Sequence, residues 1–140
     1  MSEDCIFCQI IAGEIPSNTV AETDKAYAFL DVNPLSRGHT LVIPKDHHER
    51  VGEMPTDIAG ELFKLVNEIT PAVEGAVDSP ASTVAFNNGE GAGQEVPHVH
   101  CHIVPRFAED GGKPIHSMFT GIDLSDDEMG EIAAAIRDAQ

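Results

Sequence analysis

The sequence predicts an α+β fold built around a mostly antiparallel sheet. Several short stretches rich in β-forming residues are joined by short loops, and one long segment repeats apolar residues at helical spacing. No internal repeat, low-complexity segment or linker divides the chain. Its 140 residues therefore fit one domain, residues 1–140, that is large enough to bury a core without disulfides.

The first part of the chain predicts one short helix and three strands. Residues 5–12 (CIFCQIIA) form the expected helix, which Gly13 closes. Residues 19–23 and 26–31 (AYAFLD) are expected to be strands around an acidic turn. Residues 33–38 (NPLSRG) carry Pro and Gly and predict a loop, which leads into a strand over residues 39–44 (HTLVIP).

The middle of the chain predicts the longest helix, with Thr56 as its cap. Apolar residues recur at helical spacing from Ile58 to Val77. Pro71 lies inside this pattern and is expected to kink or interrupt the helix. A strand over residues 83–88 (TVAFNN) follows Ser79-Pro80.

The last part predicts a glycine-rich loop, a long strand and a terminal helix. The loop covers residues 89–94 (GEGAGQ), and the strand covers residues 98–107 (HVHCHIVPRF). Residues 125–128 (SDDE) form a capping box that opens an acidic helix. We expect residues 108–140 to form a C-terminal extension of the domain.

Composition restricts the classes of partner. Twenty-four acidic residues against eight Lys and Arg give a net charge of −16, so no basic patch is available for nucleic acid. This charge indicates either a solubilising surface or, the reading we favour, a halophilic adaptation in which salt screens the self-repulsion. No apolar run is long enough to span a membrane, and the acidic start does not resemble a signal peptide. Three cysteines, an odd number, favour a reducing, cytoplasmic setting.

Three histidines alternate along the predicted last strand: His98, His100 and His102. On a strand they share one face at intervals of roughly 6.5–7 Å, whereas Cys101 and its apolar neighbours face the core. In a metal site, all three ligand nitrogens would have to lie about 2.0–2.1 Å from one ion, and a straight strand holds the third histidine too far away. A single imidazole that acts as a nucleophile does not need the three rings to converge. A fraction of histidine side chains is unprotonated near neutral pH and can therefore attack phosphorus. The three glycines of the preceding loop let backbone N–H groups approach an anion, as phosphate attack requires.

These residues also carry a family resemblance. The run His98-Val99-His100-Cys101-His102-Ile103 resembles the His-φ-His-φ-His-φ signature of the histidine-triad (HIT) nucleotide hydrolases and transferases. Residues 38–45 (GHTLVIPK), 87–89 (NNG), 92–94 (AGQ) and 103–106 (IVPR) resemble further blocks of that family. The similarity covers about residues 5–107 and is greatest to the Hint-like branch. It implies a five-stranded antiparallel sheet with one long and one or two short helices, and a homodimer with a continuous sheet.

The resemblance assigns a role to each site residue. It implies that His100 becomes covalently nucleotidylated at the α-phosphorus of a purine nucleotide, with no metal needed for the chemistry. The supporting histidines would be His98, His102 and His39. Glu95 stands where some Hint-like members carry a small hydroxyl residue, and we expect its carboxylate to repel anionic leaving groups. The implied nucleotide contacts come from Asp31, Asn87, Gly93, Gln94, His100 and His102.

The resemblance also implies a structural zinc ion. Some family members with an N-terminal cysteine pair hold zinc with two histidines, and the matching residues here are Cys5, Cys8, His47 and His98. His48 is an adjacent candidate ligand. The two cysteines could instead be a redox pair or buried apolar groups.

We therefore expect a hydrolase acting on a nucleoside phosphoramidate or a dinucleoside polyphosphate. The alternative is a non-catalytic nucleotide-binding or scaffold dimer with structural zinc, and a third reading is a metal-dependent hydrolase that uses the triplet as ligands. Retention of His100 favours the enzyme.

Overall fold

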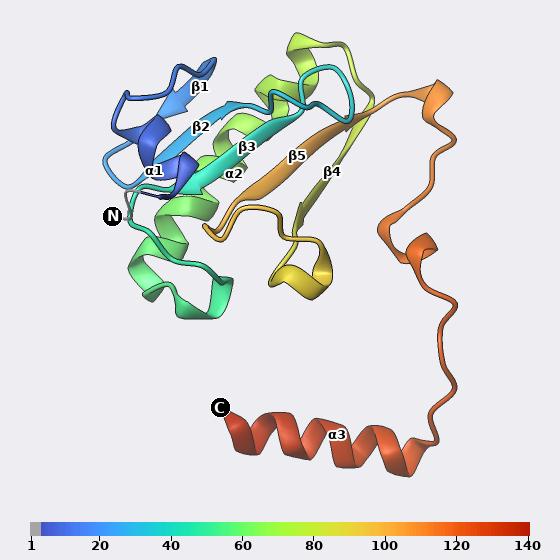
Figure 1. Cartoon of the computed structure of the whole chain (residues 1–140). Helices are drawn as coiled ribbons and strands as arrows, with labels where there is room; N and C mark the ends of the chain where they lie inside the picture. The colour runs from blue at the N-terminus through green and yellow to red at the C-terminus, as the bar shows by residue number, and fades with distance from the viewer. Residues whose placement is uncertain (1–3) are drawn as a thin grey trace.

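A computed structural model describes residues 4–140, and it contains a five-stranded sheet in the order β1-β2-β3-β5-β4 (Figure 1). Every neighbouring pair of strands is antiparallel. This confirms the predicted α+β class and the five-stranded sheet. The strands are β1 (Thr19–Glu22), β2 (Ala26–Leu30), β3 (Thr40–Pro44), β4 (Ala81–Phe86) and β5 (Cys101–Arg106).

Helices cover both faces of the sheet. The long helix α2 (Thr56–Ala76) packs on one face against Ala28, Val42 and Ile103. The short helix α1 (Ile6–Ile11) packs on the other face against Phe29 and Leu41, which alternate with the first set along β2 and β3. The third helix, α3 (Asp126–Ala139), stands apart from the sheet (Figure 1). The single-turn 3₁₀ segments are Val51–Glu53, Glu90–Ala92, Ala108–Asp110 and Ile115–Met118.

The prediction that Pro71 interrupts the long helix is wrong. The helix α2 runs unbroken past Pro71, whose side chain is exposed, so the missing N–H frees a carbonyl on the solvent side. The buried neighbours Ile69 and Val73 hold the helix to the sheet on either side of it. Thr56 is the first helical residue rather than the cap, and the cap position, Pro55, makes no side-chain bond. The predicted capping box is confirmed, because Ser125 Oγ accepts a bond from the Glu128 N–H at 3.1 Å.

The strand that carries the triad begins later than predicted. It starts at Cys101, and His98 and His100 lie in irregular backbone before it. Two bonds shape that approach: the His98 N–H donates to the Val96 carbonyl at 2.8 Å, and the Val99 N–H donates to the His48 carbonyl at 2.7 Å. Likewise β4 ends at Phe86 rather than residue 88.

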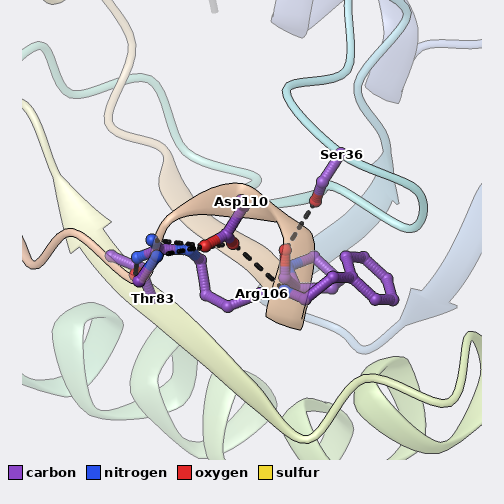
Figure 2. A network of polar contacts seen from close by, with 7 residues as sticks. Ser36, Thr83, Arg106 and Asp110 are labelled. Carbon is purple, nitrogen blue, oxygen red and sulfur yellow. Dashed lines mark hydrogen bonds and ion pairs between the residues drawn. The ribbon is translucent and has the colours of Figure 1, made fainter.

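A network of polar contacts lies at the end of β5 (Figure 2). The Arg106 guanidinium donates to both carboxylate oxygens of Asp110, at 2.7 and 3.1 Å, and to Thr83 Oγ1 at 3.0 Å. Asp110 also accepts bonds from the N–H groups of Phe107 and Gly112. The Arg106 bonds first, and then these two N–H groups, hold the pKa of the Asp110 carboxyl far below its usual range. Ser36 Oγ donates to the Pro105 carbonyl at 2.7 Å and so joins the 33–38 loop to β5.

Beyond this network, every residue from 111 to 140 is exposed except the half-buried Ala134. We therefore propose that residues 108–140 are an extension of a single domain, because they add no buried residue to its core. No helix within residues 4–140 has the length and apolar character needed to cross a membrane.

Candidate functional site

A cavity of about 390 Å³ lies between α1, the loop after β2 and the start of β5. One wall is apolar and comes from the α1 side, with Ile6, Phe7 and Ile10. The opposite side is polar and brings together seven residues that are far apart in the sequence. They are Asp31, His39, Asn87, Gly93, Glu95, His100 and His102.

Hydrogen-bond partners determine which nitrogen of each cavity histidine carries the proton. The Leu35 N–H donates to His39 Nδ1 at 3.1 Å, so Nδ1 is an acceptor and neutral His39 is protonated on Nε2. His39 Nε2 lies 2.9 Å from His102 Nδ1 and therefore donates to it. Neutral His102 then carries its proton on Nε2, which makes that atom a hydrogen-bond donor in the cavity wall.

His100 has the opposite tautomer. Its Nδ1 lies 2.8 Å from the carbonyl of His98, and because a carbonyl can only accept, Nδ1 carries the proton. Nε2 is left as the ring nitrogen with a lone pair. The ring is 7% exposed and is held edge to face between Phe7, at 5.1 Å between centroids, and His102, at 4.9 Å. A ring with an unprotonated Nε2, His100, thus lies beside a ring with a protonated Nε2, His102.

Burial keeps the supporting imidazoles neutral. Burial, together with the positive charge that His100 and His39 carry when protonated, lowers the pKa of His102 to about 4. Burial also lowers the pKa of His39, and the nearby Asp31 carboxylate partly opposes that shift from 3.7 Å. Since the predicted chemistry uses neutral imidazoles, this environment favours it at physiological pH.

The glycine-rich loop is held in place by Gln94. Its Oε1 accepts a bond from the Gly89 N–H at 2.7 Å, and its Nε2 donates to the Glu49 and Val96 carbonyls. Gly89 and Gly93 both have positive φ, which explains why glycine occupies these two turns. Gln94 therefore does not line the histidine cavity. It lines an adjoining cavity of about 630 Å³ with Glu49, Arg50 and Glu90, and Glu95 and Gly93 border both cavities.

His98 faces a different group of residues. Its Nε2 donates to the Pro44 carbonyl at 2.8 Å, so the lone pair is on Nδ1. That Nδ1 lies 3.3 Å from Cys5 Sγ, 3.6 Å from Cys8 Sγ and 3.2 Å from His47 Nδ1. Cys8 Sγ lies 3.4 Å from His47 Nδ1. Burial lowers the pKa of His98 to about 4, which keeps the neutral form that a metal requires.

The spacing of these four atoms fits tetrahedral zinc. With Zn–N of about 2.05 Å and Zn–S of about 2.3 Å, tetrahedral ligands lie about 3.3 Å apart for two nitrogens and about 3.6 Å for nitrogen and sulfur. The four separations given above agree with these values to within about 0.3 Å. His48 is not in the group, and its buried Nε2 has no hydrogen-bond partner among residues 4–140.

The expectation that all three triad histidines share one face is confirmed. Val99, Cys101 and Ile103 pack in the core cluster on the α2 side, whereas His98 and His100 both contact Phe7 of α1, and His102 lies against His100. Along this face His98 lies beside Cys5 and Cys8, while His100 and His102 line the cavity. The third reading, a metal held by the triplet, loses its geometry because the three histidines do not bring their ligand atoms together among residues 4–140. Asp31, His39 and His102 do have ligand atoms within 4.8 Å of one another, but the His39–His102 bond already satisfies the two nitrogens involved.

Sequence reasoning missed two contributors to the site. One is the apolar wall from α1, although Ile6 and Ile10 at helical spacing beside Phe7 were a signal for it. The other is the backbone N–H of Leu35, which sets the tautomer of His39 and has no side-chain signal.

The comparisons with known proteins agree with this geometry. The HIT domain model matches residues 12–109. A HIT-like protein of Methanocaldococcus jannaschii is 45% identical over 91% of this chain and 98% of its own length. An adenosine 5'-monophosphoramidase of Schizosaccharomyces pombe is 42% identical over 77% of this chain and 78% of its own.

Solved structures are similar over nearly the whole chain. A HIT family member from Bacillus subtilis has a TM-score of 0.90 at 38% identity, covering 99% of this chain and 98% of its own. A zinc-bound histidine triad family protein from Mycobacterium smegmatis has a TM-score of 0.72 at 29% identity, covering 98% of each chain. A family model that matches well over half of the chain, together with these relatives, places the protein: it belongs to the HIT family.

Proposed function

We propose that this protein is a nucleotide hydrolase or transferase that acts at the α-phosphorus of a purine nucleotide through a covalent nucleotidyl-His100 intermediate. One observation carries the proposal: the bond from His100 Nδ1–H to the His98 carbonyl leaves Nε2 with its lone pair, and the neighbouring ring is that of His102, whose Nε2 must be a donor. This is the pairing that attack on a phosphoryl group needs, a nucleophile next to a donor for the phosphoryl oxygen.

The reaction has two displacements. His100 Nε2 attacks the α-phosphorus in line, a P–N bond forms, and the bond to the leaving group breaks. Water then attacks the same phosphorus and breaks the P–N bond, which releases a nucleoside monophosphate. His102 holds the phosphoryl oxygen in both steps, and backbone N–H groups near Gly93 add further donors. His39 keeps His102 in the donating tautomer, so it acts as a positioning residue.

Cavity composition supports a nucleoside as the bound group. The apolar wall around Ile6, Phe7 and Ile10 offers a surface for a flat base, and Asp31, which lines the same cavity, can accept bonds from ribose hydroxyls. The name of the S. pombe relative favours an adenosine 5'-phosphoramidate as substrate. Asn87 and Gly93 line the same cavity, which supports their role as phosphate contacts, whereas Gln94 would act indirectly by holding the loop.

We further propose structural zinc bound by Cys5, Cys8, His47 and His98, with no role in the reaction itself. The tetrahedral spacing of the four ligand atoms supports it. In this role His98 fixes the carbonyl that orients His100, rather than acting as an acid or base. All three cysteines are free thiols, which favours a reducing, cytoplasmic setting.

We also propose a homodimer in which two copies join through the β4 edge. Within residues 4–140, the strand order leaves one side of β4 without a neighbouring strand, and Val84 on β4 is 42% exposed. An exposed edge strand with an apolar residue is a ready surface for pairing with a second copy.

The test follows AMP release and protein mass with adenosine 5'-phosphoramidate and with a diadenosine polyphosphate, in high and low salt. We expect a transient gain of one AMP on the wild type. His100→Ala should lose both adduct and turnover while still binding AMP. His116→Ala, a change in the exposed extension, is the control and should behave as the wild type.

The alternative is a nucleotide-binding scaffold dimer. AMP binding without adduct or turnover on either substrate, in both salt conditions, would refute the enzyme and favour the scaffold.

A further inference from the structure

The loop between β2 and β3, residues 32–38, is tied to β5 by a serine side chain. Ser36 Oγ donates to the Pro105 carbonyl at 2.7 Å (Figure 2). Within residues 4–140, the other hydrogen bonds of this loop go to residues 31–40 of the same segment. Val32 and Leu35 are 77% and 76% exposed, so packing does little to hold the outer part of the loop. Its position therefore depends on the Ser36 bond.

Ser36 also begins the tight turn that leads into His39. The His39 N–H donates to the Ser36 carbonyl at 3.2 Å, as in a β-turn. Near the other end of the turn the backbone packs closely, because a Cβ on Gly38 would lie 3.0 Å from Val77 Cγ1 and 3.3 Å from Pro105 Cγ. The turn is thus held at one end by packing and at the other end by the Ser36 hydroxyl.

The residue before this turn, Leu35, sets the position of a proton in the cavity. Its N–H donates to His39 Nδ1, so the His39 proton is on Nε2, which donates to His102 Nδ1. If the Leu35 N–H moves away, His39 can adopt the opposite tautomer, with its proton on Nδ1. The bond between the two rings then persists only if His102 Nδ1 donates, and His102 Nε2 becomes an acceptor instead of a donor.

We propose that Ser36 is a positioning residue for the reaction: its bond to the Pro105 carbonyl holds the loop where it keeps His102 donating to the phosphoryl oxygen. The inference rests on the proposed function, because that function makes His102 the donor. Ser36 is not among the residues that line the cavity, so it acts through the Leu35 N–H and His39 rather than on the substrate.

The expected effect follows from the strength of one hydrogen bond. A neutral hydrogen bond such as the one from the Leu35 N–H changes an equilibrium constant by roughly two- to tenfold. Ser36→Ala should therefore lower the ratio of Nε2–H to Nδ1–H tautomer in His39 by roughly two- to tenfold, and the His102 ratio should fall with it. The kcat for AMP release should fall as the donating fraction of His102 falls, while KM changes little.

The test is ¹⁵N–¹H correlation spectroscopy of the imidazole rings near neutral pH, in full-length protein labelled with ¹⁵N-histidine, with kcat and KM measured on the same samples. Ser36→Thr keeps the hydroxyl and should restore the wild-type tautomers and kcat. Ser117→Ala is the matched control, because Ser117 Oγ donates to the Pro114 carbonyl at 2.8 Å in the exposed extension. In every form His100 should stay protonated on Nδ1, because its partner is the His98 carbonyl, and its signal reports that the fold is intact.

The ring signals decide the outcome. Wild-type tautomers of His39 and His102 in Ser36→Ala would overturn the proposal, even if kcat falls, because Ser36 would then have only a structural role. The same tautomer shift in Ser36→Thr as in Ser36→Ala would also overturn it. A wild type that releases no AMP would refute the proposed function, and the ring signals would still show whether Ser36 sets the tautomers.

Discussion

Replacing Cys8 by Ser tests the zinc proposal, because Cys8 Sγ lies within 3.6 Å of both histidine ligands. A hydroxyl is a much poorer zinc ligand than a thiolate, so this variant should hold much less zinc. Wild type purified from zinc-supplemented cells should contain one zinc per chain by elemental mass spectrometry.

The size of the stability change follows from binding linkage. With free zinc at a thousand times the dissociation constant, binding adds about 4 kcal/mol to the unfolding free energy. For a chain of this size, each kcal/mol shifts Tm by about 3–5 °C, so removing zinc should lower Tm by roughly 12–20 °C. Calorimetry of the wild type with and without a strong chelator should show this drop, and chelator should have little further effect on Cys8→Ser.

Cys101→Ala is the matched control. Cys101 is equally buried but lies in the core cluster on the other face of the sheet. This variant should lose stability from the small cavity, yet keep its zinc and its full response to chelator. The proposal would be refuted by a wild type that contains no zinc and whose Tm does not change when chelator is added. Equal loss of zinc in the Cys8→Ser and Cys101→Ala variants would also refute it.

Four further predictions concern other parts of the molecule. His102→Ala should lower kcat for AMP release by about 10²–10³ with little change in AMP affinity, because it removes one donor to the phosphoryl oxygen. Stopped-flow and binding assays beside His116→Ala would measure this. The His102 pKa is about 4 when folded and near 6.5 when unfolded, so its contribution to stability is present above pH 6.5 and is lost as pH falls toward 4. Urea unfolding at a series of pH values should show this decline, and His102→Gln should show a shallower one. Tm should rise with KCl from about 0.1 to 2 M as salt screens the charge of −16, and a flat or falling Tm would contradict halophilic adaptation. Pro71→Ala should raise the unfolding free energy by about 1–3 kcal/mol in urea melts, because it restores an N–H on an exposed helix face.

Periodicity was sufficient to predict the elements whose apolar pattern is long. The helix α2 and the central strands β2 and β3 lie within a few residues of their predicted bounds, since burial on alternate faces determines both pattern and structure. The effect of Pro71 was predicted wrongly because the sequence shows the local cost of proline in a helix, a few kcal/mol, but does not show the tertiary packing that opposes it. The buried residues on both sides of Pro71 outweigh the lost hydrogen bond.

The sequence predicted which residues belong to the candidate site better than it predicted the hydrogen bonds between them. The histidines were evident from their spacing, and the period of two correctly predicted their common face, although the strand begins only at Cys101. What sequence could not reveal is the pairing of side chains with backbone groups from distant segments. The Leu35 N–H and the Pro44 and His98 carbonyls decide the tautomers, and every residue type supplies such groups.

The hydrogen bonds of His98 have a chemical consequence. His98 and His100 lie on the same face of the sheet and both contact Phe7, but His98 Nδ1 lies beside Cys5 and Cys8 rather than in the cavity. The ring of His98 is bound to the Pro44 carbonyl, while its own carbonyl accepts the proton of His100 Nδ1. One residue thus joins the proposed zinc site to the orientation and tautomer of the proposed nucleophile. This coupling gives the buried cysteine pair a reason to lie beside the reaction site even if the ion never contacts substrate: it stiffens the 2.8 Å bond that keeps Nε2 free.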